Sequence, residues 1–86
     1  MSGIGKILEN VLRGTTDNNI AFASLCLLMR RMGVSNRIKG SHHIFYKDGI
    51  EDIINLQPQN SGKAKAYQVK QVRNLILKYK LGGQIK

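Results

Sequence analysis

The sequence predicts an α+β domain in which a three-stranded antiparallel sheet is covered on one face by helices. Apolar residues first recur with a helical period, the pattern changes after Gly33 to short alternating runs, and the helical period returns from Tyr67. With 86 residues, the chain suffices for one modest hydrophobic core and leaves no room for a second. These observations together predict a single small mixed domain.

Two helices are expected in the first third of the chain. Apolar residues at helical spacing predict the first over residues 3–13, with Ser2 as its N-cap. The second covers about Phe22 to Met32, and Gly33 ends it. The polar run Thr15 to Asn19 separates them, since its side chains compete for backbone hydrogen bonds and favour loops.

Three short strands follow, at Asn36 to Lys39, His42 to Lys47 and Glu51 to Gln57. Asp48-Gly49 is a strong hairpin signal, for which both turn residues are expected to have a positive φ, and Gly40-Ser41 supplies the first turn. Because both turns are short, the strands form an antiparallel meander.

A polar loop over residues 59–66 and a last helix from Tyr67 complete the chain. The predicted order is α-α-β-β-β-α, with the second and last helices side by side on one face of the sheet. This two-layer order is that of small double-stranded-RNA-binding domains. We divide the chain into an N-terminal helix and linker (1–19), a main domain (20–81) and a tail expected to fray (82–86).

The charge is strongly asymmetric. Fourteen Lys and Arg oppose five acids, the net charge is +9, and no acid follows Asp52. This balance favours a polyanionic partner: nucleic acid first, then an acidic protein, then an anionic membrane surface. The single cysteine, Cys26, lies among leucines and predicts a buried thiol in a reducing cytoplasm. No apolar run is long enough to span a membrane, and no membrane or cofactor partner is predicted.

Both histidines lie together in the second predicted strand. Alternation places His42 and Tyr46 on one face and His43 and Phe45 on the other. If Phe45 joins the core, His42 faces outward, and His43 lies near the edge of the covered face, where a structural hydrogen bond is its expected duty. The general alternative is that both histidines are structural or solvated.

Several chemistries fit this strand poorly. Adjacent strand histidines point to opposite faces, so they do not close on one metal ion. Ser41 directly precedes His42, which is unfavourable geometry for a serine nucleophile. RNA cleavage needs fewer catalytic groups from the protein, because the 2′-hydroxyl of the RNA is the nucleophile. The protein supplies only a base and cations. We therefore predict His42 as the catalytic base, with Lys39 and His43 as auxiliary candidates.

Further residues are candidates for RNA binding. Cations and polar groups would contact phosphates, and Tyr46 would stack a base on the open face. The candidates are Arg37, Lys39, Ser41, Tyr46, Lys63, Lys65, Lys70 and Arg73.

At these residues the chain resembles the HicA family of small toxins from bacterial type II toxin–antitoxin pairs. The likeness is carried by the run from Arg37 to Phe45 with Gly40-Ser41-His42 at its centre, by Gly62 to Lys65, and by Val72 to Lys78. It covers residues 20–81, so the N-terminal helix is an extension. The third strand also lacks a histidine that some members carry near Asn55.

The resemblance implies a double-stranded-RNA-binding-like fold and metal-independent endoribonuclease action on mRNA. It also implies that His42 is the catalytic histidine and that a HicB-type antitoxin neutralises the toxin. The rival interpretation is a noncatalytic RNA-binding or protein-binding module of the same fold.

Overall fold

The computed structural model describes residues 3–84. The helices are α1 (Gly3–Arg13), α2 (Phe22–Arg31) and α3 (Ala66–Tyr79), and the strands are β1 (Ser35–Lys39), β2 (His42–Lys47) and β3 (Ile50–Leu56). Short 3-10 turns, η1 (Asp17–Asn19) and η2 (Leu81–Gln84), follow α1 and α3. The predicted α+β class and the order α-α-β-β-β-α are confirmed. Ser2, the expected cap of α1, lies outside the described residues.

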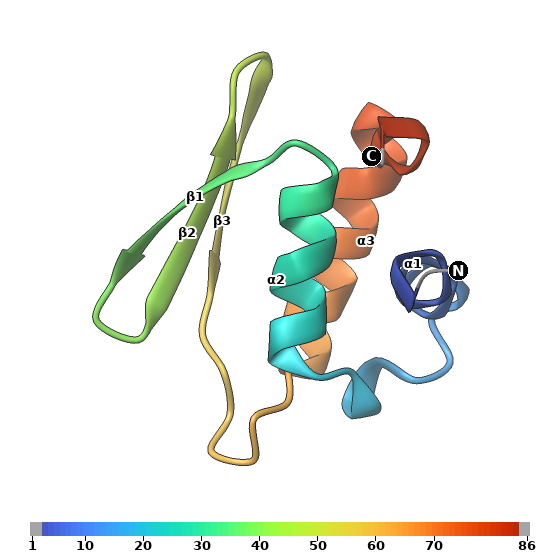
Figure 1. The fold of residues 1–86 in the computed structure, drawn as a ribbon, viewed down its shortest axis with the longest axis vertical. Coiled ribbons are helices and arrows are strands. Elements are labelled where there is room, and N and C mark those ends of the chain that lie inside the picture. Colours follow the sequence, from blue (N-terminus) through green and yellow to red (C-terminus); the bar gives the residue numbers. More distant parts are fainter. Residues whose placement is uncertain (1–2, 85–86) are drawn as a thin grey trace.

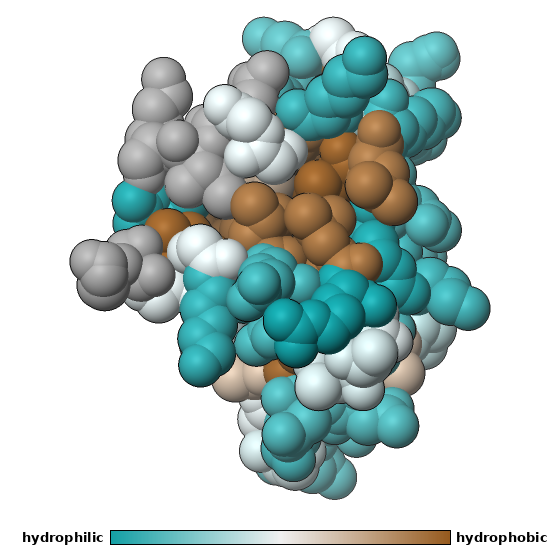
Figure 2. Space-filling model, turned by 90° about the vertical axis from the view of Figure 1, so that its right-hand side faces the viewer, coloured by the Kyte–Doolittle hydropathy of each residue, from teal (hydrophilic) through white to brown (hydrophobic). Residues whose placement is uncertain are grey.

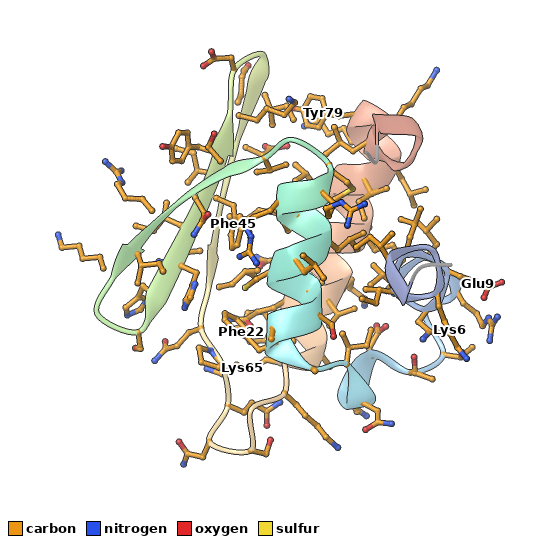
Figure 3. The ribbon with its side chains drawn as sticks, viewed as in Figure 1. Lys6, Glu9, Phe22, Phe45, Lys65 and Tyr79 are labelled. Carbon is orange, nitrogen blue, oxygen red and sulfur yellow. The ribbon has the colours of Figure 1, made fainter. Side chains whose placement is uncertain are left out.

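The three strands form one antiparallel sheet in the order β1-β2-β3. Figure 1 shows α2 and α3 side by side against one face of this sheet, while the other face has no helix over it. Alternation explains the choice of face, since Phe45, Ile54 and Leu56 all lie on the covered side and are buried. Figure 3 shows Phe45 pointing from β2 toward α2.

Helix α1 forms an additional layer, whose position was not predicted from the sequence. It crosses α2 and α3 on the side away from the sheet (Figure 1), and its Ile4 and Val11 are buried there. The predicted two-layer sandwich is therefore extended by a third, one-helix layer. Figure 2 shows apolar surface among hydrophilic residues on this side of the molecule, where Leu8 and Leu12 of α1 remain partly exposed.

One local prediction was wrong, and another is tested only in part. In the Asp48-Gly49 turn, Gly49 has a positive φ of 86° and Asp48 does not, so the turn needs the left-handed region at one position only. Residues 82–84 of the tail that was expected to fray belong to η2, and residues 85–86 lie outside the described residues. Leu81 is buried, and a Cβ built at Gly82 would meet Leu8 at 3.7 Å and Ile76 at 3.9 Å.

The sheet is irregular on one side of β2. Phe45 pairs with Ile54, but Lys47 pairs with Ile50, so Tyr46 on β2 faces three residues, 51–53, on β3. A bulge of this kind interrupts the ladder and twists the strand locally. It leaves Tyr46 without a directly paired residue on β3.

Candidate functional site

The candidate site lies on the uncovered face of the sheet. His42 begins β2, is exposed, and projects to the side opposite the buried Phe45. The predicted orientation of His42 is therefore confirmed. Position 42 is also at one end of the sheet, next to the Gly40-Ser41 turn. A large ligand can therefore approach the imidazole from the uncovered face and from this end of the sheet.

The neighbouring strand β3 holds the imidazole ring. The Nδ1 atom of His42 lies 3.1 Å from the amide oxygen of Asn55. Because an amide oxygen only accepts hydrogen bonds, this contact selects the tautomer with its proton on Nδ1. In a neutral ring with this tautomer the lone pair is on Nε2, which is then the atom at which the imidazole can accept a proton.

The sequence analysis gave Asn55 no role. The contact is between residues 13 positions apart, and it depends on the register of β2 against β3. The available signal was the polar side chain one position before the buried Leu56. The group that orients the imidazole in the structure is an amide.

The turn before His42 is built for a close approach of β1 and β2. Lys39 and His42 are directly paired across the hairpin, and Gly40 has a φ of 64° at the first turn position. Directly paired residues have Cβ atoms about 5 Å apart. Lys39 therefore lies beside His42 on the same face.

Ser41 is tied to the end of β3. The side-chain amide of Gln57 donates a hydrogen bond of 3.2 Å to its hydroxyl oxygen. The backbone of Gln57 is in turn held by the buried Gln68 of α3, whose amide donates to its carbonyl and accepts from its N–H, both at 3.0 Å. A buried glutamine satisfied in this way connects α3 to the turn beside His42.

Farther along the same face, Arg37 and Tyr46 form a second pair. The guanidinium carbon of Arg37 lies 5.9 Å from the centre of the Tyr46 ring, within the range of a cation–π contact. Ile44, half-buried, lies between Tyr46 and His42 on β2 and is paired with Arg37. The face thus carries cations on β1 and apolar groups on β2.

His43 lies on the covered side, as predicted, but its contact differs from the expected hydrogen bond. Its ring meets Phe22 of α2 edge to face, with centroids 4.9 Å apart. The side chain is half-buried at the entrance to the core. Its separation from His42 by the plane of the sheet argues against a shared catalytic role.

The loop before α3 is fastened to the start of α2. Lys63 and Ala21 form an isolated antiparallel β-bridge. The backbone N–H of Phe22 donates to the carbonyl of Gly62, and the backbone N–H of Ala64 donates to the carbonyl of Ile20. Lys63 is exposed and Lys65 half-buried. Because Gln57 contacts Ser41, this loop leaves β3 at the same end of the sheet as His42.

The two α3 cations have different surroundings. Lys70 is exposed, but α3 packs on the covered face, so Lys70 lies on the opposite side of the sheet from His42. Arg73 donates to both carboxylate oxygens of Asp17, at 3.0 and 3.2 Å, and to the carbonyl of Val11 at 3.1 Å. These bonds correct the prediction of Arg73 as a free phosphate ligand, because its guanidinium is already engaged in holding α1 and η1 to α3.

Cys26 has a structural environment. Burial raises the pKa of its thiol to about 11, although the nearby Arg30 charge acts in the other direction. A thiol with a raised pKa is a poor nucleophile near neutral pH. Within residues 3–84, no three His, Cys, Asp or Glu side chains gather closely enough to hold a metal ion.

None of the helices in the described part of the chain combines the length and hydropathy needed to cross a bilayer. Comparison of the chain with protein-family models, with curated proteins and with solved structures finds no match.

Proposed function

We propose that this protein is a metal-independent endoribonuclease that cleaves mRNA, with His42 as the general base. The observation that carries the proposal is the contact between His42 Nδ1 and Asn55 on the open face, because a neutral imidazole that donates from Nδ1 has its lone pair on Nε2. Lys39, paired with His42, supplies positive charge where a phosphate would lie.

The proposed step is an in-line displacement. Nε2 of His42 takes the proton from a ribose 2′-hydroxyl, and the 2′-oxygen attacks the adjacent phosphorus. A bond forms between that oxygen and phosphorus, and the bond from phosphorus to the 5′-oxygen breaks, which gives a 2′,3′-cyclic phosphate. The leaving 5′-oxygen takes a proton from water, because His43 lies on the other side of the strand. The hydroxide that forms takes the proton held on Nε2 of His42, which restores the base.

The biological setting is also a proposal. The run from Arg37 to Phe45 supports assignment to HicA-like toxins of bacterial type II toxin–antitoxin pairs, and the α2, β1-β2-β3, α3 arrangement supports a double-stranded-RNA-binding-like fold. A HicB-type antitoxin with an acidic surface would complement the +9 charge. Action on mRNA would take place in the cytoplasm.

The test is RNA cleavage in the presence of a chelator. His42→Ala is expected to reduce the rate about 100-fold to 10 000-fold, the range that a positioned base contributes. Binding of a noncleavable RNA should persist, since His42 is exposed and its loss leaves the fold intact. Asn55→Leu should reduce the rate about three- to ten-fold, because the base remains but loses one orienting hydrogen bond.

His43→Gln is the matched control, since it removes the other imidazole on the same strand. Its cleavage rate should stay within about two-fold of the wild type, because its ring packs on Phe22. Equal cleavage by His42→Ala would contradict the proposal. RNA binding without cleavage by the wild type would favour a noncatalytic module.

A further inference from the structure

We infer that the open face is a binding surface for single-stranded RNA, in which an unpaired base stacks on Tyr46 and phosphates follow the edge strand β1. This inference rests on the proposed function for the identity of the ligand and deepens it by naming the substrate class. It depends on the arrangement of Arg37, Lys39, Ile44 and Tyr46 around His42.

Tyr46 is available for stacking. Its side chain is 42% exposed on the uncovered face, and the irregularity of β3 leaves it without a paired neighbour on that side. Bulges of this kind are found next to functional sites, where they redirect a side chain. A large exposed aromatic ring on the same face as a candidate catalytic residue is suited to bind a planar group.

Arg37 strengthens this platform. Its guanidinium lies 5.9 Å from the ring centre and approaches one side of the ring, so a base stacking on the other side completes an Arg–Tyr–base stack. Arginine contributes to such stacks both through its planar group and through its charge. The same charge is placed to attract a phosphate.

The positions of the cations and of the apolar side chains on the open face determine how an RNA strand would lie. Arg37 and Lys39 are two residues apart on β1 and share the open face, about 6.7 Å apart along the strand. This is comparable to the spacing of consecutive phosphates in an extended nucleic acid. Ile44 and Tyr46 lie on the neighbouring strand β2. Phosphates along β1 therefore place the bases over β2.

The distance along β2 relates the stacked base to the cleaved bond. His42 and Tyr46 are four residues apart on one face, about 13 Å along the strand. The stacked base therefore belongs to a nucleotide beyond those joined by the cleaved bond. Tyr46 would bind the RNA and contribute to sequence preference without touching the reacting atoms.

A duplex does not fit this surface. The bases of an RNA double helix are stacked on one another and are unavailable to a protein side chain, whereas unpaired bases can stack on aromatic residues. The in-line geometry that His42 needs is also more accessible in a flexible single strand, because reacting groups must align before attack. The inferred substrate class is unpaired RNA.

The test measures binding of a fluorescently labelled single-stranded RNA with 2′-O-methyl groups, which cannot be cleaved by 2′-hydroxyl attack. Tyr46→Leu is expected to weaken binding about five-fold to 150-fold, the range for loss of one stacked base. Tyr46→Phe should bind within about two-fold of the wild type, since the ring remains. Tyr67→Leu is the matched control: Tyr67 is a 58% exposed tyrosine on α3 and should not affect binding.

The proposed phosphate contacts of Arg37 and Lys39 are tested by the salt dependence of binding. Arg37→Gln and Lys39→Gln should each reduce the slope of log affinity against log salt by about one, whereas Lys6→Gln on α1 should leave it unchanged. Wild-type protein should bind the single strand at least ten-fold more tightly than a duplex of the same sequence. This comparison does not depend on how any variant folds.

Equal binding of duplex and single strand, or unchanged binding by Tyr46→Leu, would overturn the inference. The outcome is separable from that of the proposed function. Binding that depends on Tyr46 without any cleavage would refute the nuclease and retain the single-strand surface. Cleavage that depends on His42 but not on Tyr46 would do the reverse.

Discussion

Arg73→Leu should destabilise the fold through α1, because Arg73 is the side chain that connects α3 to the C-terminal end of α1 and to η1. Its guanidinium makes three hydrogen bonds, two to Asp17 and one to the carbonyl of Val11. Leucine keeps apolar volume at the site but leaves the carboxylate of Asp17 and the carbonyl of Val11 without this donor. The substitution thus isolates the polar contribution of Arg73.

The expected loss of stability follows from the burial of the Arg73–Asp17 ion pair. The side chains of Arg73 and Asp17 are 15% and 18% exposed, so the pair is largely shielded from water. Breaking a fully buried pair costs about 3–5 kcal/mol, and partial exposure reduces this to about 2–3 kcal/mol. For a domain of this size, a loss of that order lowers Tm by about 10–20 °C.

Urea unfolding followed by circular dichroism measures the change, with Lys70→Leu as the matched control. Lys70 is exposed on the same helix, so its replacement should change the free energy of unfolding by less than about 0.5 kcal/mol. Asp17→Asn combined with Arg73→Leu should cost less than the sum of the two single changes. A loss below about 0.5 kcal/mol for Arg73→Leu, together with weaker RNA binding, would refute the structural role and restore the predicted phosphate contact.

Two further predictions concern buried groups. Above pH 9 the unfolded Cys26 thiol loses its proton while the folded thiol, with its pKa near 11, keeps it; stability should therefore fall between pH 9 and 11 by up to about 1.4 kcal/mol per pH unit. Urea unfolding at pH 8 and 10 should show a smaller fall for Cys26→Ala, and equal falls would contradict the reasoning. Gln68→Leu should cost about 1–3 kcal/mol, because both backbone groups of Gln57 lose their partner; an unchanged urea midpoint would show that water replaces the amide.

Local patterns in the sequence account for much of the sheet. Alternation in β2 separates Phe45 from His42, and this assignment is confirmed because burial of one face requires its neighbours to point away. The two hairpins follow from glycines at short turns. The helices α2 and α3 follow from apolar residues at helical spacing, since each helix has one side to bury.

The contacts that orient His42 and that engage Arg73 come from pairings between distant segments. His42 contacts Asn55, and Arg73 contacts Asp17 across 56 positions. Neither contact is encoded by a local period. Arg73 of α3 was therefore predicted to contact RNA, whereas in the structure its guanidinium binds Asp17 and the carbonyl of Val11.

The sequence by itself determined the element order, the outward direction of His42 and the excess of positive charge, because each depends on local periodicity or composition. Tertiary structure alone decided which group orients the imidazole, where α1 packs and which cations remain available. The physical reason is that these depend on strand register and on the docking of helices, and both are set by packing of the whole core. Asn55, Arg73 and the irregularity beside Tyr46 acquire their roles only when the chain is folded.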